Sequence, residues 1–293
     1  MTFNENSRFD SKNVQRRRGR GGAIAGGGGV LVLLLGLLST QFLGFDVTQF
    51  LGGGAPGGGQ QQAEDLECTG AEANASFDCR MEGGAVTLEQ YWAETAPQLG
   101  VSAYNDPTVV LYDGSTSSGC GSASNAVGPF YCPSDEGIYI DGQFFDILTQ
   151  RYGAEGGPLA EMYVLAHEWG HHIQKLEGTL QQVDHRDVGP TSGMVRLELQ
   201  ADCYAGAWMG SASQYTDDAG NQILREPTRD EIQQTISSAQ AIGDDNIQEQ
   251  AGKEVQPETF SHGTSEQRTN WLMRGYQEGV GACDSFGVPG SEL

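Results

Sequence analysis

The chain has 293 residues, enough for one or two domains with a hydrophobic core. It has 16 Lys/Arg and 39 Asp/Glu residues, and residues 1–45 contain six of the basic and two of the acidic ones. Residues 46–293 therefore hold 16 − 6 = 10 basic and 39 − 2 = 37 acidic residues, a formal net charge of −27. A surface this negative repels phosphate backbones and anionic lipids, which argues against a nucleic-acid partner. We interpret the acidity as a contribution to solubility outside the cell, and a preference for basic substrates is the alternative.

The first 65 residues divide into three segments by composition. Residues 1–20 are polar and basic and are predicted to form a disordered cytoplasmic tail. Residues 21–45 carry no charge and are long enough to cross a bilayer once as a helix, with the basic run before them on the cytoplasmic side. No Ala-x-Ala cleavage site follows this run, which favours an uncleaved anchor over a signal peptide. Residues 46–65, rich in Gly and Gln, are predicted to be a flexible linker.

The six cysteines all follow the uncharged segment, which predicts disulfides in an exported domain. Six cysteines allow 15 pairings. Short separations favour Cys68–Cys79 and Cys120–Cys132, which leaves Cys203–Cys283. A cysteine-based metal site is the alternative, but the sequence has no CxxC. These features predict a single-pass membrane protein with a cytoplasmic N-terminus and an extracytoplasmic domain at residues 66–293.

Beyond residue 66 the apolar pattern predicts a small β part and then a helix-rich part. Short apolar runs between turn residues predict a strand at 107–114 and a strand–turn–strand around Tyr131 and 138–140. Apolar residues at spacings of three and four predict helices, and two capping-box patterns mark further helix starts. The predicted helices span 87–100, 143–151, 158–178 and 192–210, and two more begin after Thr228 and Thr264. The expected fold class is α+β, preceded by one transmembrane helix.

The stretch LAHEWGHHIQ, residues 165–174, holds three of the five histidines on one predicted helix. Residues four apart share a helix face, so His167 and His171 can direct both imidazoles at one zinc ion. Glu168 lies beside that point, where it can act as general base on a zinc-activated water. His172 is rotated about 140° from His167 and is not expected to be a ligand. The alternative is a surface helix with incidental histidines.

Zinc needs a third protein ligand, and the helix predicted for 192–210 offers one. Glu198 and Asp202 are four residues apart in an apolar stretch, where two acids are costly unless a positive charge meets them. We expect Glu198 to be the third ligand. We expect Asp202 to accept a hydrogen bond from the second ring nitrogen of a zinc-bound histidine. The alternative is a surface ion pair between Arg196 and one of the acids.

HExxH followed about 27 residues later by ExxxD resembles the gluzincin branch of zinc metallopeptidases. More narrowly, the sequence resembles the neutral zinc metallopeptidase family, the bacterial YpfJ-like proteins, from about residue 107 to residue 286. The stretches that carry this resemblance are CGSASNAVGPFYCPSDEGIYID, HEWGHHIQ, RLELQADCYAGAW and HGTSEQRTNWLMRGYQEG. It implies a zincin-like domain with one Zn²⁺ per chain, with His167, His171 and Glu198 as ligands and Glu168 as the catalytic residue. Trp169 inside the HExxH is a mild departure.

Two further features bear on mechanism. His262 precedes a predicted helix start, and we interpret it as a donor to the oxyanion of the scissile carbonyl, with Tyr204 and Arg268 behind it. A surface residue at a helix entry is the alternative. In zincin-type enzymes an extended substrate lies along a sheet edge, and segment 131–140 is the candidate for that edge.

The sequence thus predicts a membrane-anchored extracytoplasmic zinc metallopeptidase that hydrolyses peptide bonds. Its expected partners are a peptide or protein substrate and the membrane, through the N-terminal helix, but not nucleic acid. Two alternatives stay open: a non-catalytic zinc-dependent binding domain at the cell surface, and a zinc amidase that acts on cell-wall peptides. The presence of Glu168 favours an enzyme, because a structural site would fill all four zinc positions with protein ligands. Other divalent ions also suit a His₂Glu set.

Overall fold

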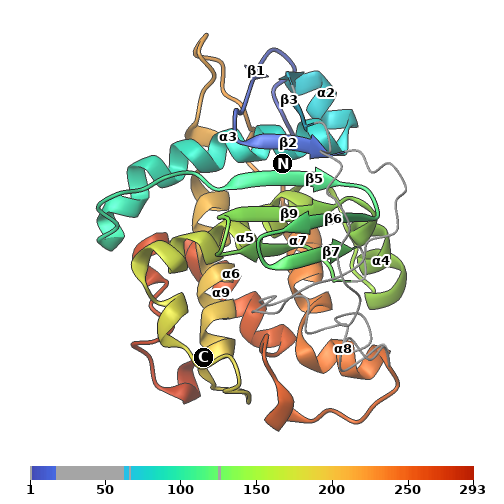
Figure 1. The fold of residues 1–293 in the computed structure, drawn as a ribbon, viewed down its shortest axis with the longest axis vertical. Helices are drawn as coiled ribbons and strands as arrows, with labels where there is room; N and C mark the ends of the chain where they lie inside the picture. The colour runs from blue at the N-terminus through green and yellow to red at the C-terminus, as the bar shows by residue number, and fades with distance from the viewer. Residues whose placement is uncertain (1, 18–62, 66, 125–126) are drawn as a thin grey trace.

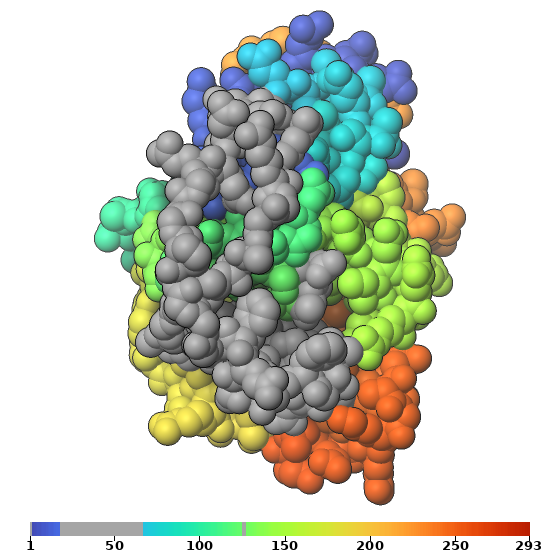
Figure 2. Space-filling model, turned by 45° about the vertical axis from the view of Figure 1, so that its right-hand side comes forward, coloured from blue at the N-terminus to red at the C-terminus, as the bar shows by residue number. Residues whose placement is uncertain are grey.

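The computed structural model describes residues 2–17, 63–65, 67–124 and 127–293. Over these ranges the chain has an α+β architecture, in which strands gather on one side and helices pack behind and below them (Figure 1). The N-terminal segments, drawn in blue and cyan, gather at one end of the molecule, and a large group of orange residues from the C-terminal part lies at the opposite end (Figure 2). The predicted α+β class is therefore present, whereas the described residues contain no helix that could be the predicted transmembrane helix.

The larger sheet of the described chain has the strand order β3-β2-β5-β9-β8. Strands β2, β5 and β9 are parallel, and β3 and β8 pair antiparallel at the two edges. The antiparallel pairs β1–β4 and β6–β7 accompany this sheet. The strands are β1 (Arg8–Phe9), β2 (Val14–Arg17), β3 (Ala63–Asp65), β4 (Cys68–Thr69), β5 (Thr108–Tyr112), β6 (Ser115–Ser118), β7 (Gly121–Ser124), β8 (Phe130–Cys132) and β9 (Gly137–Asp141).

Both faces of β5, the middle strand of the larger sheet, are apolar. Side chains alternate between the faces of a strand, so Val109 and Leu111 of β5 face the main core, whereas Val110 and Tyr112 join a smaller cluster with Ala123 of β7. A strand that is buried on both faces appears in the sequence as a continuous apolar run. This explains why the sequence alone predicted a strand at 107–114.

The helices form the main core against one face of this sheet. Helix α5 packs against α3, α6 and α7, and α6 lies along α9 over most of its length. The helices are α2 (Gly70–Ala75), α3 (Phe77–Thr95), α4 (Gln143–Tyr152), α5 (Pro158–Glu177), α6 (Gly193–Ser211), α7 (Arg229–Ala241), α8 (Asp244–Gln250) and α9 (Ser265–Glu278).

Local signals set the ends of the helices that matter most for function. Helix α5 has Pro158 in its first turn and ends at Gly178, whose φ of 82° suits a residue without a side chain. Thr228 and Thr264 each form a complete capping box with the residue three positions later, at the starts of α7 and α9. Because these signals are local, the sequence predicted these ends.

Glycines allow α6 to approach its neighbours closely. A Cβ on Gly206 would lie 2.0 Å from the carbonyl oxygen of Leu272 in α9, and a Cβ on Gly275 would lie 1.9 Å from the carbonyl oxygen of Cys203. On the other side of α6, a Cβ on Gly170 of α5 would lie 3.0 Å from an α6 backbone atom. These three positions bring α5, α6 and α9 to backbone contact.

The prediction of a single-pass membrane protein is wrong. In the part of the chain that the structure describes, no helix combines the length and apolarity that a bilayer crossing requires. The predicted anchor, 21–45, and most of the predicted linker, 46–65, lie outside the described residues. Residues on both sides of that anchor share one sheet, since Val14 of β2 pairs with Val109 of β5 and Arg17 pairs with Ala63. A single membrane crossing between residues 17 and 63 would place these paired strands on opposite sides of a bilayer. The predictions of a cytoplasmic N-terminus and of membrane contact are therefore wrong as well.

The N-terminal segment is part of the fold. Phe3 is 1% exposed and forms a β-bridge with Leu224. Arg16, which was expected to flank a membrane, forms ion pairs with Asp78 at 3.2 Å and Asp113 at 2.7 Å. At least this basic residue before the uncharged segment therefore has acidic partners inside the domain.

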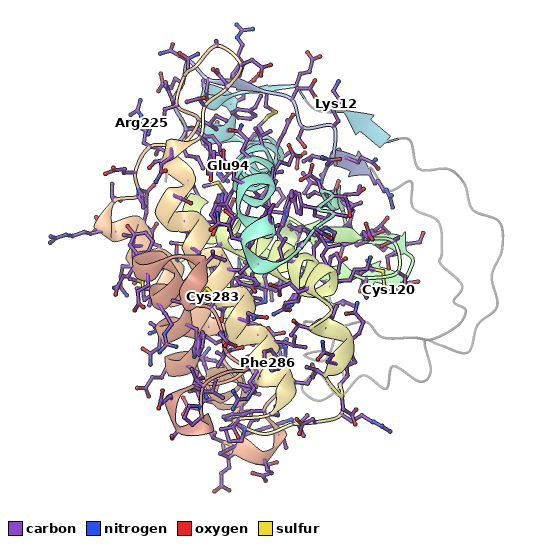
Figure 3. All side chains as sticks on the ribbon, turned by 90° about the vertical axis from the view of Figure 1, so that its left-hand side faces the viewer. Lys12, Glu94, Cys120, Arg225, Cys283 and Phe286 are labelled. Carbon is purple, nitrogen blue, oxygen red and sulfur yellow. A yellow bond between two sulfur atoms is a disulfide. The ribbon has the colours of Figure 1, made fainter. Side chains whose placement is uncertain are left out.

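The six cysteines form three disulfides: Cys68–Cys79, Cys120–Cys132 and Cys203–Cys283. Cys120 lies on the strand side of the molecule, and Cys283 lies among the helices (Figure 3). The first two are the pairs that short sequence separations favoured, and the third is the pair that they left. Glu82 lies beside the first disulfide, but a metal site there is excluded because both thiols are bonded to each other.

Candidate metal centre

Two neighbouring helices bring ionisable side chains together inside the core. Helix α5 carries His167, Glu168 and His171, and α6 carries Glu198 and Asp202. All five residues are at most 3% exposed. Ionisable groups at this depth need partners of opposite charge or hydrogen-bonding partners. Their contacts therefore decide what the cluster can do.

Metal-binding atoms from three of these side chains lie close together. Nε2 of His167 is 3.2 Å from Nε2 of His171 and 3.3 Å from Oε2 of Glu198, and Nε2 of His171 is 3.6 Å from Oε1 of Glu198. Ligand atoms placed about 2.1 Å from a tetrahedral zinc ion are about 3.4 Å from one another. The three side chains therefore fit a His₂Glu metal site, and their atoms are close enough to share one ion.

The second ring nitrogen of each histidine has a hydrogen-bond acceptor. Nδ1 of His167 donates to Oδ1 of Asp202 at 2.8 Å, because a carboxylate can only accept. Nδ1 of His171 lies 2.8 Å from Oε1 of Gln174, whose amide nitrogen donates to the carbonyl of Leu197 at 2.7 Å. With the proton on Nδ1, each ring presents Nε2 to the other ligands. This arrangement is usual for metal-binding histidines.

The buried carboxylates control the protonation of these rings. Burial favours the neutral form of His167, but Asp202 and Glu198 outweigh it and raise its pKa to about 10. Burial lowers the pKa of His171 to about 4. Burial opposes ionisation of Glu198, yet the two histidines hold its pKa well below its usual range. Without a metal, the site thus contains one imidazolium beside a carboxylate, and a divalent ion would displace that proton.

A buried cation from α9 neutralises part of the negative charge. Arg268 is 0% exposed, donates to Oδ1 of Asp202 at 2.9 Å, and comes within 3.5 Å of Oε2 of Glu198. Tyr163, one turn before His167, donates to Oδ1 of Asp202 at 2.5 Å. Asp202 therefore receives three hydrogen bonds and is fixed beside His167.

Glu168 is buried but not tied to any neighbour. Neither carboxylate oxygen has a hydrogen-bond partner within the described ranges, and the side chain is 0% exposed. Burial raises its pKa to about 7, and the backbone amide of Tyr131 in β8 is close enough to moderate the shift. A perturbed, unpartnered carboxylate beside a ligand cluster is typical of a group that exchanges protons with a substrate.

His262 is held by Asp244, the first residue of α8. One oxygen of Asp244 accepts the backbone N–H groups of residues 261, 262 and 263 at 2.8, 2.7 and 3.0 Å. The other oxygen lies 3.0 Å from Nδ1 of His262. Burial lowers the pKa of His262, but Asp244 and Glu198 raise it above its usual value. The alternative of an exposed helix-entry residue does not apply, because His262 is 2% exposed.

Other polar residues of the sequence prediction lie elsewhere. Tyr204 was expected behind His262, but its hydroxyl donates to Glu177 at 2.9 Å. His172 points away from the ligands, with Nδ1 2.9 Å from the hydroxyl of Tyr131 and Nε2 2.7 Å from the carbonyl of residue 105. Arg196 contacts carbonyl oxygens near the C-terminus and pairs with neither acid of the cluster.

Three contributors escaped the sequence prediction. Gln174 is three residues after His171 and Tyr163 is four before His167, so the helical spacing that revealed the ligands also places both on the same face. Asp244 gave no usable signal, because it begins α8 and its partner His262 lies 18 residues later, just before α9.

Comparisons with known proteins agree with this geometry. Residues 3–286 match the model of a family described as "Putative neutral zinc metallopeptidase". The uncharacterized protein Rv2575 of Mycobacterium tuberculosis is 42% identical over 220 residues, 74% of this chain and 73% of that protein. The uncharacterized protein YpfJ of Escherichia coli K12 is 37% identical over 295 residues, 96% of this chain and 97% of that protein. No solved structure matches the chain.

Proposed function

Because the chain belongs to the neutral zinc metallopeptidase family, we propose that it is a zinc-dependent peptidase with His167, His171 and Glu198 as metal ligands. The observation that carries this proposal is the close approach of atoms from these three side chains, at 3.2, 3.3 and 3.6 Å, with the carboxylate of Glu168 beside them. Three protein ligands leave the fourth zinc position for a water or substrate, as in catalytic rather than structural sites.

Glu168 is proposed as the general base and then the acid. A bound zinc ion would polarise the substrate carbonyl and lower the pKa of water. Burial raises the pKa of Glu168 to about 7, so its carboxylate can take a proton from the attacking water at neutral pH. The same carboxyl then returns the proton to the leaving amine. No side chain in the described part of the chain holds either oxygen, so the carboxyl can turn from the water to the amine.

His262 is proposed as the donor to the oxyanion. Asp244 fixes both the backbone and the ring of this residue, and the raised pKa favours the protonated imidazole. A positive donor held rigidly near the ligand cluster stabilises negative charge on the scissile carbonyl oxygen. Arg268 supports this arrangement indirectly, since it holds Asp202 and reaches Glu198.

Strand β8 is proposed as the edge that receives the substrate. It is the last strand of the larger sheet as described, and the Cys120–Cys132 disulfide fixes its end. Its middle residue, Tyr131, is anchored to His172 of α5 at 2.9 Å, and its backbone amide lies beside Glu168. An extended peptide added to this edge would place its carbonyl next to the proposed base.

Replacing Glu168 with glutamine tests the proposal. We expect the variant to bind about one zinc per chain, measured by metal analysis, and to lose at least about 100-fold in cleavage of casein or a peptide library. Glu177→Gln is the matched control, because Glu177 lies on the same helix and burial also raises its pKa to about 7. Zinc-loaded wild-type protein that cleaves neither proteins nor cell-wall peptides would instead favour a non-catalytic binding domain.

A further inference from the structure

A chain of buried amide groups runs from His171 to the C-terminal segment. Oε1 of Gln174 accepts from Nδ1 of His171 at 2.8 Å, and Nε2 of Gln174 lies 3.0 Å from Oε1 of Gln200. Nε2 of Gln200 lies 3.2 Å from the backbone carbonyl of Cys283. Gln174, Gln200 and Cys283 are 0, 6 and 2% exposed. Nothing in the proposed mechanism uses these side chains.

Two backbone carbonyls, of Cys283 and Leu197, together fix the direction of every hydrogen bond in this chain. A carbonyl only accepts, so Gln200 must direct its NH₂ group at Cys283 and its oxygen at Gln174. Gln174 must then direct its NH₂ group at Gln200 and at the carbonyl of Leu197, which leaves its oxygen for His171. His171 can bond to that oxygen only through a proton on Nδ1. The network therefore specifies the tautomer in which Nε2 is free to bind a metal.

The carbonyl of Cys283 is held in place by a covalent bond. Cys283 is joined to Cys203, which lies one turn after Gln200 on α6. Figure 3 shows Cys283 among the helices, away from the strand side of the molecule. Arg196 holds the segment after Cys283, because its guanidinium donates a hydrogen bond to the carbonyl of Val288 at 2.9 Å. The disulfide thus fixes the acceptor that orients Gln200.

The two metal-binding histidines are supported differently. His167 donates directly to a carboxylate, Asp202, which Arg268 and Tyr163 immobilise. His171 donates to a neutral amide, whose orientation depends on the carbonyl of Leu197, on a second amide and on a disulfide-tethered carbonyl. The support of His171 therefore extends to the C-terminal segment, whereas the support of His167 comes from α5, α6 and α9.

We propose that Gln174 and Gln200 are positioning residues for His171, and that the Cys203–Cys283 disulfide contributes to metal affinity through them. The inference rests on the proposed metal site. Loss of the amide chain frees the ring of His171 to rotate or change tautomer, and the metal must then supply the free energy that orients it. Partners of this kind are typically worth 10–100-fold in metal affinity.

Zinc affinity, measured by competition with a chromophoric chelator, tests the role of the amides. We expect Gln174→Met to weaken zinc binding by about 10–100-fold, because the proton on Nδ1 of His171 loses its acceptor. Gln200→Met should weaken it by a smaller factor, because the carbonyl of Leu197 still holds Gln174. Gln248→Met is the matched control: Gln248 is 4% exposed and also bridges two groups, at 3.1 and 2.7 Å, but it contacts no metal ligand. A loss of stability with unchanged affinity in Gln174→Met would overturn the proposal.

A double-mutant cycle tests the role of the disulfide. The pair Cys203→Ala/Cys283→Ala should weaken zinc binding in the wild-type background and add nothing in the Gln200→Met background. Equal losses in both backgrounds would show that the disulfide acts by another route and would overturn that part of the inference. If the cysteine variant does not fold, the two glutamine variants decide the matter alone. Wild-type protein that binds no zinc would refute the proposed function itself, whereas equal zinc affinity in all variants would refute only the amide chain.

Discussion

Replacing Gly275 with alanine should separate α9 from α6. The new Cβ would lie 1.9 Å from the carbonyl oxygen of Cys203 and 2.9 Å from the backbone nitrogen of Ala207. Carbon–oxygen contacts without a covalent bond begin at about 3.3 Å. Because the obstacle is the backbone of a helix rather than a flexible side chain, α9 must retreat by more than about 1 Å.

That displacement would reach the candidate metal centre through Arg268. Positions 268 and 275 are two helical turns apart on the same face of α9, and Arg268 donates to Asp202 at 2.9 Å. Overpacking costs about 1–3 kcal/mol and breaking a buried ion pair about 3–5 kcal/mol, against a gain of about 1 kcal/mol from alanine in a helix. We expect the free energy of unfolding to fall by at least about 3 kcal/mol.

Urea unfolding followed by circular dichroism measures this loss, with Gly84→Ala as the control. Gly84 also lies inside a helix at a helix contact, but its added Cβ would meet the flexible side chain of Met162 at 3.3 Å. The control should therefore stay within about 1 kcal/mol of the wild type. A Gly275→Ala protein as stable as the control would refute the reasoning that backbone contact sets the α6–α9 distance.

Three further predictions follow from buried charges and strand pairing. Burial raises the pKa of Glu177 from 4.5 to about 7, so the stability that its protonated form contributes is present below pH 4.5 and is lost as the pH rises through 7. In urea titrations, the free energy of unfolding of Glu177→Gln should therefore rise by about 2 kcal/mol relative to that of the wild type between pH 5 and pH 8, and a difference that does not change with pH would contradict this. Arg268→Met should lower the melting temperature of the metal-free protein and should enlarge the rise in melting temperature that zinc produces, because the negative charge of Glu198 and Asp202 is then no longer offset by Arg268. An equal rise in both proteins would argue against this. Deleting residues 2–17 should abolish the cooperative thermal transition because β2 joins β3 to β5, and an unchanged transition would show that this strand is dispensable.

Sequence patterns predicted the fold where the determinants are local. Pro158, Gly178 and the two capping boxes act within a few residues, so α5, α7 and α9 begin or end where the sequence indicates. Strand β2 has the sequence VQRR, which carries no alternating apolar signal. It becomes a strand because β3 and β5 offer it hydrogen bonds and because acidic residues accept Arg16. Neither condition is visible in the residues of β2 themselves, which is why they were assigned to a tail.

The site was predictable to the extent that helical spacing defines it. An i,i+4 pair must share a face, and that rule brought His167 to His171 and Glu198 to Asp202. The rule does not say how far α6 lies from α5, which depends on Gly170 meeting the backbone of α6. It also cannot reveal Asp244, whose carboxylate organises a loop of another part of the chain.

The balance of charge in the cluster explains why so many ionisable groups can be buried together. Arg268 offsets one of the two carboxylates of α6, and in the metal-free chain the proton on His167, whose pKa is about 10, offsets the other. Glu168 is left to be neutral or ionised near pH 7. A divalent ion between the three ligands would release the proton of His167 and add positive charge next to Glu168, which favours its ionised form. The arrangement that keeps the metal-free core neutral is therefore the one that would convert Glu168 into a base when the ion binds.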